Sequence, residues 1–394
     1  MKKTAITLFL VSVSSPALAE EVTLKPIIEA RLRYENVDQT GVLNEADAIT
    51  LRVRAGVEAK TGAFALLAET EATLAISEHY NSGLNGLAAY PIVADPQNVE
   101  LNRLQLQFSG LPKTVVTVGR QRINLDDQRF VGSVGWRQND QTLDAVRAAA
   151  RPAKSLSIDY LYAWRVNRVF GPDAAQGIWR DTDIHGARVA HQSPVLGSLS
   201  AYGYWLDIPA SPASSSMTLG VRLSGERPLA GKTRFTYAAE LAHQQDHGNN
   251  PRRFNLDYLL LEPGIARGPF ALKAGFERLE GDGVVGLQTP LATLHAFNGW
   301  ADKFLSTPAN GLRDLYLDAS AKATGGPLKG AALRVVWHDF NATRGGIDYG
   351  TEFDAQLAYP VRKNVTLLAK FARYDADAFA TDTTKAWFQV EAKF

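Results

Sequence analysis

The chain has 394 residues, of which 45% are hydrophobic, 21% are charged and 9% are aromatic. This composition, with 42 basic against 41 acidic residues, argues against a disordered chain. The net charge of +1 argues against a basic nucleic-acid-binding protein. A helical membrane protein needs runs of about 20 apolar residues, and no such run follows residue 19. The absence of cysteine excludes disulfides and sulfur chemistry.

The N-terminus has the features of a secretory signal peptide. Lys2 and Lys3 precede a mostly apolar stretch at residues 5–13, and the small-x-small sequence at residues 17–19 is typical of a cleavage site. We therefore expect residues 1–19 to be removed during secretion, and residues 20–394 to form a single domain.

From residue 23 onward, apolar residues alternate with polar ones, which predicts β-strands. The alternation is clearest at residues 217–224, 234–241, 333–338 and 388–394. In a soluble sandwich, the apolar face of each strand packs on a second sheet. In an outer-membrane barrel, that face contacts lipid and the polar face lines the lumen.

The connections between the predicted strands favour the barrel. Short turns that contain Gly or Pro lie at residues 61–62, 111–113, 151–153, 194–197, 227–231, 263–269, 325–327 and 359–364. They alternate with longer polar loops at residues 36–47, 78–98, 124–141, 168–182, 207–215, 245–253, 281–311, 340–350 and 375–384. Transmembrane barrels sort their connections in this way, with short periplasmic turns and long extracellular loops. The sequence therefore predicts an all-β fold, a transmembrane antiparallel β-barrel of 18 strands in the bacterial outer membrane.

The polar faces of the predicted strands bring many charged side chains into the lumen. The arginines on these faces are Arg31, Arg33, Arg52, Arg54, Arg103, Arg120, Arg122, Arg188, Arg222 and Arg334. The acids of the later strands, which we expect to form an opposing acidic wall, are Asp257, Asp314, Asp318, Glu352 and Asp354. Charged walls raise the local concentration of a charged solute. The alternative is a polar lumen that carries both signs without such an effect.

The turn at residues 61–62 predicts the register of the second and third strands. It sets Arg54 opposite Glu69 and Arg52 opposite Glu71. Opposite charges across a strand pair are stabilising, so these four side chains are predicted to form ion pairs that stiffen the wall.

The turn at residues 111–113 predicts a different arrangement. It sets Arg103 opposite Arg120, with Arg122 one step away. Like charges directly opposite each other are destabilising. Such a cluster indicates either neighbouring acids or a constriction that attracts anions, and the sequence leaves both open.

The loop at residues 281–311 is the longest, and loops beyond about 12–15 residues are usually functional or disordered. Its apolar residues argue against disorder; they are Leu287, Leu291, Leu294, Phe297, Trp300 and Phe304. We expect a short amphipathic helix that begins near residues 289–290 and packs over or into the mouth of the barrel. The alternative is burial in lipopolysaccharide or at a subunit contact.

Signatures of catalysis or metal binding are weak. The seven histidines have no metal-ligand spacing, and no nucleophile elbow or phosphate-binding loop occurs. Asp126, Asp127, Asp181 and Asp183 could bind calcium, although solvated loop acids are the more common case. We expect no catalytic residue, no metal, no cofactor and no enzymatic activity.

Two stretches resemble a known family. Residues 119–147 (GRQRINLDDQRFVGSVGWRQNDQTLDAVR) and residues 287–304 (LQTPLATLHAFNGWADKF) are similar to the alginate-export family of bacterial outer-membrane porins. The resemblance implies an 18-stranded barrel whose arginine-rich, anion-selective lumen passes uronate polymers. The lumen contacts that it implies are Arg120, Arg122, Arg129, Arg137 and Arg147. The turn at residues 359–364 is short, whereas the exporter itself has a long periplasmic turn near its C-terminus.

These features together predict a porin for small hydrophilic, preferentially anionic solutes such as uronates or oligosaccharides. The alternatives are an exporter of alginate or another anionic polysaccharide, and an adhesion or structural barrel without transport. The expected partners are anionic or carbohydrate solutes, outer-membrane lipid and lipopolysaccharide. The barrel-assembly machinery is also expected, because Phe394 ends an alternating strand as in many outer-membrane barrels. No nucleic acid is expected.

Overall fold

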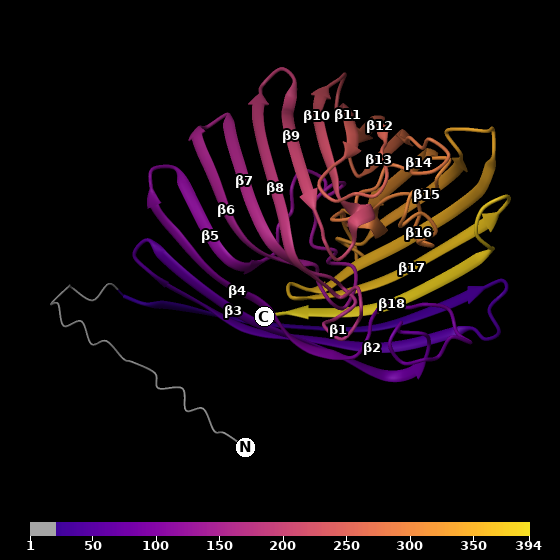
Figure 1. Cartoon of the computed structure of the whole chain (residues 1–394), viewed down its shortest axis with the longest axis horizontal. Helices are drawn as coiled ribbons and strands as arrows, with labels where there is room; N and C mark the ends of the chain where they lie inside the picture. The colour runs from indigo at the N-terminus through magenta and orange to yellow at the C-terminus, as the bar shows by residue number, and fades with distance from the viewer. Residues whose placement is uncertain (1–20) are drawn as a thin grey trace.

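The computed structural model describes residues 21–394, and the predicted signal peptide lies outside the described residues. Each strand pairs antiparallel with its neighbours in sequence. Because β1 pairs with both β2 and β18, the sheet closes into a barrel of 18 strands (Figure 1). The predicted fold class and strand number are confirmed.

The strands are β1 (Thr23–Gln39), β2 (Ala46–Thr61), β3 (Phe64–His79), β4 (Asn98–Leu111), β5 (Thr114–Gln121), β6 (Thr142–Ala153), β7 (Leu156–Asn167), β8 (Ile178–Ser193), β9 (Gly197–Asp207), β10 (Ser216–Pro228), β11 (Thr233–Asp246), β12 (Asn255–Arg267), β13 (Phe270–Leu279), β14 (Leu312–Lys322), β15 (Ala332–Asn341), β16 (Asp348–Arg362), β17 (Val365–Ala376) and β18 (Thr383–Lys393). Two three-residue 3₁₀ helices occur, η1 (Pro212–Ser214) and η2 (Leu294–Ala296). No helix within residues 21–394 has the length and apolar character needed to cross a membrane.

The alternation of residue types sorts side chains between the two faces of the wall. On β10, Leu219 and Val221 are exposed on the outer face, while Thr218 is buried on the inner face. An outer band of exposed apolar residues next to a polar interior is the arrangement of a transmembrane barrel.

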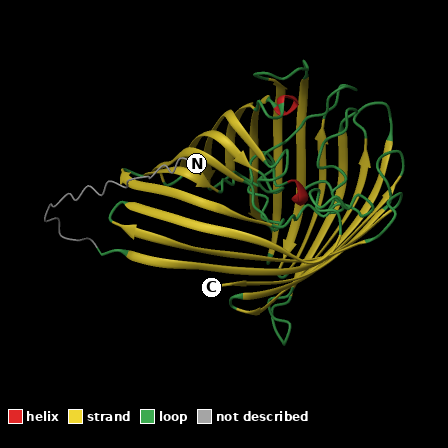
Figure 2. Ribbon diagram, turned by 60° about the horizontal axis from the view of Figure 1, so that its bottom comes forward, coloured by secondary structure: helices red, strands yellow, loops and turns green. Residues whose placement is uncertain are grey.

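Three long loops at one end of the barrel fold into its interior. We name them L2 (residues 80–97), L3 (residues 122–141) and L7 (residues 280–311). Figure 2 shows loop segments running inside the curved wall. L3 leaves the wall because β5 is only 8 residues long, whereas its neighbour β4 has 14.

L3 and L7 pair with each other and form a hydrophobic core with the wall. Val131 bridges to Leu291, and the Gly132 amide donates to the Leu291 carbonyl over 2.8 Å. Phe304 packs against Phe340 on β15, with 4.5 Å between the ring centroids. The prediction that the loop at residues 281–311 enters the barrel is therefore confirmed.

The predicted amphipathic helix in this loop is wrong, because only the 3₁₀ turn η2 forms there. The physical reason is the wall. The Trp300 and Ala301 amides donate to the carboxylates of Asp354 and Glu352 over 3.1 and 2.6 Å. Wall side chains thus satisfy the amides that a helix would have satisfied internally.

Both register predictions are wrong. Arg54 lies opposite Glu71, and Arg52 lies opposite Thr73, two residues away from the predicted pairing. Between β4 and β5, Arg120 lies opposite Leu104 and not opposite Arg103. The pairing of β4 with β5 is irregular between residues 108 and 111, and a one-residue shift changes the face on which a side chain lies.

Candidate functional site: a charged lumen with two inserted loops

Arginines on β1 bind the backbone of L3. Arg31 Nη1 donates to the carbonyl oxygens of Gly135, Trp136 and Arg137 over 3.1–3.2 Å. Arg33 Nη2 donates to the Trp136 carbonyl over 2.6 Å, and its guanidinium stacks on the Trp136 ring at 4.0 Å. These two arginines are buried and fix L3 against the wall.

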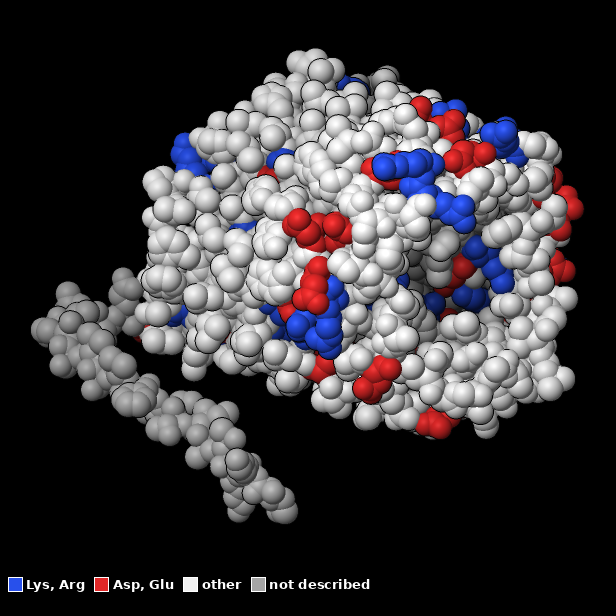
Figure 3. Space-filling view, viewed as in Figure 1, with Lys and Arg blue, Asp and Glu red and all other residues white. Residues whose placement is uncertain are grey.

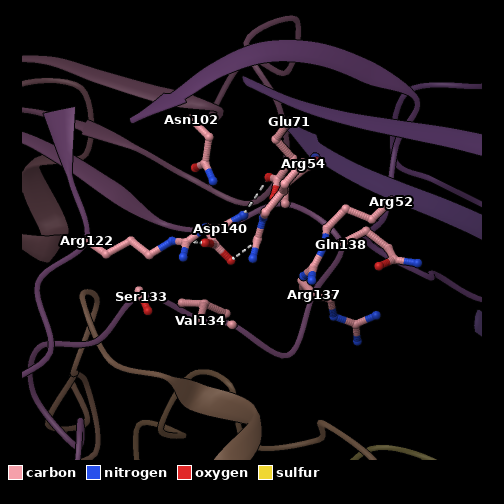
Figure 4. A network of polar contacts seen from close by, with 12 residues as sticks. Arg52, Arg54, Glu71, Asn102, Arg122, Ser133, Val134, Arg137, Gln138 and Asp140 are labelled. Atoms are coloured by element: carbon pink, nitrogen blue, oxygen red, sulfur yellow. Dashed lines mark hydrogen bonds and ion pairs between the residues drawn. The ribbon is translucent and has the colours of Figure 1, made fainter. Parts of the chain in front are cut away.

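An ion-pair network extends this attachment to β2 and β3 (Figure 4). Arg54 pairs with Glu71 of β3 and, over 2.5 Å, with Asp140 of L3. Asp140 also pairs with Arg122. Burial by itself would raise the pKa of Asp140, but Arg54 and Arg122 outweigh it and lower the pKa. The carboxylate therefore stays ionised between its two arginines.

Acids on β14 and β16 bind L7. Asp354 and Glu352 on β16 accept the backbone amides of Trp300 and Ala301. Asn298 Nδ2 donates to Asp314 Oδ2 over 3.1 Å. These wall carboxylates are almost fully buried, so they hold the loop and do not face the solvent.

L3 and L7 also contact each other at a cluster that we call the clasp. It consists of Trp136 of L3 and of His295 and Asp302 of L7. The rings of Trp136 and His295 stack with 4.4 Å between centroids and 5° between planes. His295 Nδ1 donates to Asp302 over 2.7 Å, and its Nε2 accepts from Lys370 Nζ over 2.6 Å. Burial lowers the pKa of His295 well below its usual value, in keeping with a neutral ring in this role.

Asp302 is the charged centre of the clasp. Arg137 and Lys385 each approach it to 3.0 Å. Burial alone would raise its pKa, but His295, Lys385 and Arg137 together hold the pKa well below the usual value for a carboxyl. This loop acid therefore remains ionised although it is buried.

Several arginines of the lumen remain partly accessible, among them Arg334 in the cavity described below. Four of them, which we call the arginine row, are Arg103, Arg122, Arg147 and Arg188. Their side chains are 18%, 21%, 26% and 14% exposed. Each is more exposed than any carboxylate it pairs with, and those carboxylates range from 0% to 13%. A solute in the lumen therefore meets guanidinium groups before it meets their counterions.

A cavity of about 280 Å³ lies between L7 and the wall of β10–β15. Its charged lining residues are Asp127, Arg222, Glu262, Lys273, Glu277, Asp314, Arg334 and His338. Figure 3 shows a hollow in the molecular surface with basic and acidic side chains at its bottom. Both signs of charge thus reach the interior on this side of the barrel.

Several predicted site residues have a different place from the one expected. Arg31, Arg33, Arg52 and Arg54 are buried to 7% exposure or less and cannot meet a solute. Arg31, Arg33 and Arg54 hold L3, whereas Arg52 pairs with Glu29 and Glu391 of the wall. Arg129 is also buried, and its Nε donates to Glu277 over 2.7 Å. L3 thus covers the wall arginines, whereas Arg129, a residue of L3 itself, is buried against Glu277 and Asn298.

Two further residues are not on the inner face of the lumen. Asp257 is exposed near the start of β12 and pairs with His243 over 2.7 Å, whereas its neighbour Tyr258 is buried inside, so the prediction for Asp257 is wrong. Arg120 donates to Asp144 over 2.7 Å and to the Leu101 carbonyl over 2.9 Å. Arg120 thus links β4, β5 and β6 at the end of β5.

The sequence pattern did not indicate the residues that join the loops to the wall and to each other. Glu277, Asp302 and Lys370 are central to these contacts, yet only the apolar content of L7 indicated that the loop is inserted. Asp95 of L2 is another, since its carboxylate accepts the Gln138 amide over 2.8 Å. Within residues 21–394, no cluster of three or more potential ligands could hold a metal ion.

The closed sheet, apolar outer band and charged interior define an outer-membrane β-barrel. A family model described as "Alginate export" matches residues 27–252, which is more than half of the chain. The chain belongs to the alginate-export family. A search of curated proteins found no match.

Solved structures with the same fold are outer-membrane proteins at low sequence identity. Pseudomonas aeruginosa OpdK, determined with vanillate, has a TM-score of 0.73 and 14% identity, covering 94% of this chain and 98% of its own. Acinetobacter baumannii OccAB4 has a TM-score of 0.74 and 13% identity, covering 96% and 100%. Pseudomonas aeruginosa OccK2 (OpdF), in complex with glucuronate, has a TM-score of 0.68 and 12% identity, covering 94% and 98%.

The clasp generates a prediction about L7. Replacing Trp136 or His295 with Ala should speed amide hydrogen exchange in residues 290–305, because stacked ring pairs contribute about 0.5–1.5 kcal/mol beyond their buried area. The loss of local opening free energy in the double variant should be smaller than the sum of the losses in the two single variants, since each substitution removes the same contact. His185→Ala, at an exposed Tyr160 contact, is the control. Additive effects would refute a shared contact.

The insertion of L7 generates a second prediction. Deleting residues 287–305 should increase single-channel conductance in planar bilayers, because it empties part of the lumen. Heat-modifiable migration on gels should persist, since the strands that close the barrel are intact. Glu352→Gln, which weakens one anchor of L7 without removing the loop, should give a smaller increase. Unchanged conductance in the deletion variant would show that L7 does not restrict the pathway.

Proposed function

We propose that this protein is a passive outer-membrane channel for small hydrophilic solutes with a preference for anions. The observation that carries the proposal is the arginine row, in which Arg103, Arg122, Arg147 and Arg188 are more exposed than their acidic partners. Guanidinium groups bind carboxylates with matching geometry and keep their charge at every physiological pH.

The comparisons support this proposal at the level of ligand chemistry. OpdK was determined with vanillate and OccK2 with glucuronate, and each of these molecules is a small carboxylic acid. A channel that accepts such solutes needs a lumen where cations are reachable and their charge is not fully cancelled.

The short periplasmic turns favour a passive channel over a polymer exporter, because the exporter has a long periplasmic turn near its C-terminus. β16 ends at Arg362 and β17 begins at Val365, so the connection between them holds only residues 363–364. We therefore propose small acids, uronates and short oligosaccharides as the solutes, in preference to a long polysaccharide. We further propose that the solute is moved without enzymatic chemistry.

The test of the proposal is anion selectivity. Arg147→Gln together with Arg188→Gln should lower the anion-to-cation permeability ratio roughly two- to fivefold, as expected for removing unit charges about 4–8 Å from a solute in water. Reversal potentials across a bilayer under a salt gradient measure this ratio. Arg253→Gln is the matched control, because Arg253 is an exposed loop arginine paired with Asp246.

Two outcomes would contradict the proposal. If the ratio of the double variant equals that of the unsubstituted protein, the arginine row does not determine selectivity. If the unsubstituted protein does not conduct at all, the barrel is closed and an adhesion or structural role replaces transport.

We also propose that residues 1–19 are a secretory signal peptide that directs export of the chain and is cleaved. Protein purified from the outer membrane should then begin at Glu20, which intact-mass measurement and N-terminal sequencing would establish. A retained N-terminus would contradict this assignment without affecting the barrel.

A further inference from the structure

A second cavity, which we call the vestibule, lies among the long loops at the mouth of the barrel. Its volume is about 460 Å³, within the range of small-molecule sites. L2, L3 and L7 contribute to its lining, together with residues 168–170 after β7. The end of a transmembrane barrel that has the long loops is the extracellular one, so a solute entering from outside meets the vestibule first.

The charges that line the vestibule are mostly positive. Its cations are Arg137, Arg168, Lys303 and Lys385, and its one acid is Asp302. Asp302 is already engaged by Arg137 and Lys385. Within the described part of the chain, neither Arg168 nor Lys303 forms an ion pair with a carboxylate. These two cations are therefore available to an incoming anion.

Arg168 is held rigidly by aromatic stacking. Its guanidinium lies 4.2 Å from the centre of the Trp179 ring and 4.8 Å from that of Phe170. Among the described residues, the guanidinium donates one hydrogen bond, from Nη1 to the Gln176 carbonyl over 3.2 Å. The remaining N–H donors form a planar edge suited to a carboxylate.

Lys303 is the second cation that has no acidic partner within residues 21–394. Its Nζ donates to Gln39 Oε1 over 3.2 Å, which leaves further donors of the ammonium group unused. Burial lowers the pKa of Lys303 to about 8, and the neighbouring Lys385 adds to this effect, while Glu352 and Asp302 oppose it. Lys303 therefore remains mostly charged at neutral pH.

The rest of the vestibule lining is largely apolar. Its larger apolar and aromatic side chains, against which the body of a ligand would lie, include Tyr90, Phe170, Pro290, Leu294 and Leu305. The neutral amide side chains of the lining are Gln39, Asn81 and Gln141, so most hydroxyl groups of a sugar acid would lie against apolar side chains without hydrogen-bond partners, which is costly. An aromatic or short aliphatic acid would bury its body there at no such cost. The shape and polarity of the lining thus select the body of the ligand, and the cations select its charge.

We propose that the vestibule is a binding site for small monocarboxylates with an apolar or aromatic body, whose carboxylate is held by Arg168 and Lys303 before the solute passes L7. This inference rests on the proposed channel function and names the class of solute.

Equilibrium binding to the purified full-length barrel in detergent tests the proposal, with benzoate as the probe. Benzoate should bind at least tenfold more tightly than glucuronate, and benzyl alcohol, which lacks the charge, should bind more weakly than benzoate. Arg168→Gln and Lys303→Gln should each weaken benzoate binding roughly tenfold, as expected for losing one charged hydrogen bond. Arg253→Gln and Lys60→Gln, at exposed positions, should leave binding unchanged.

The pH dependence provides an independent readout. Benzoate affinity should fall as the pH is raised from about 7 to about 9, because Lys303 loses its proton in this interval. The Lys303→Arg variant should bind benzoate with little change over the same interval, since an arginine stays charged. This comparison does not require a variant that loses binding, and heat-modifiable migration checks the folding of each protein.

The proposal is overturned if benzoate binding is insensitive to both substitutions, or if glucuronate binds as tightly as benzoate. Bilayer conductance separates this failure from that of the proposed function. An anion-selective channel without benzoate binding would refute the vestibule site and leave the channel function intact. A non-conducting barrel that binds benzoate through Arg168 and Lys303 would refute the channel function and leave the site intact.

Discussion

A loop that enters a closed barrel carries backbone amides and carbonyls that must find partners there, and in this protein charged side chains of the wall provide them. Arg31 and Arg33 on β1 donate to carbonyl oxygens of L3. Glu352 and Asp354 on β16 accept amides of L7. The sign of the wall charge matches the type of backbone group it meets. These contacts fix the positions of both loops. The positions of the loops then determine which wall side chains remain exposed in the lumen.

Buried ion pairs are a costly way to obtain stability, because desolvation of the charges offsets most of their attraction. Breaking one partner of such a pair costs about 3–5 kcal/mol, since the other charge is left uncompensated. The main effect of this ion-pair network is to raise the free energy of other positions of L3. The network consists of Arg54, Glu71, Asp140 and Arg122. A shift of the loop would leave several charges buried without a counterion at once. The result is one defined loop position in place of an ensemble.

The loops divide the arginines of the wall into two groups with different consequences. Those beneath L3 are buried and structural, as Arg33 and Arg52 illustrate. Those beyond its reach, such as Arg147, remain partly exposed and can act on a solute. The first stretch that resembles the alginate-export family, residues 119–147, lies within the residues 27–252 that match the family model and includes the whole of L3. Part of what this chain shares with that family thus lies where the lumen is narrowed.

Alternation and turn spacing were sufficient to predict the barrel, its 18 strands and the inward direction of residues such as Arg103 and Asp314, because lipid outside and water inside impose a period of two on every strand. The apolar residues of L7 were sufficient to predict that this loop is inserted, since water would not tolerate them. Local pattern could not predict the position of Arg120 or Asp257, because an irregularity or a shift of one residue changes the face of a side chain. Nor could it predict that L3 covers Arg33 or that Arg168 and Lys303 share a cavity, because these contacts join residues far apart in sequence and form only when the closed barrel confines its loops.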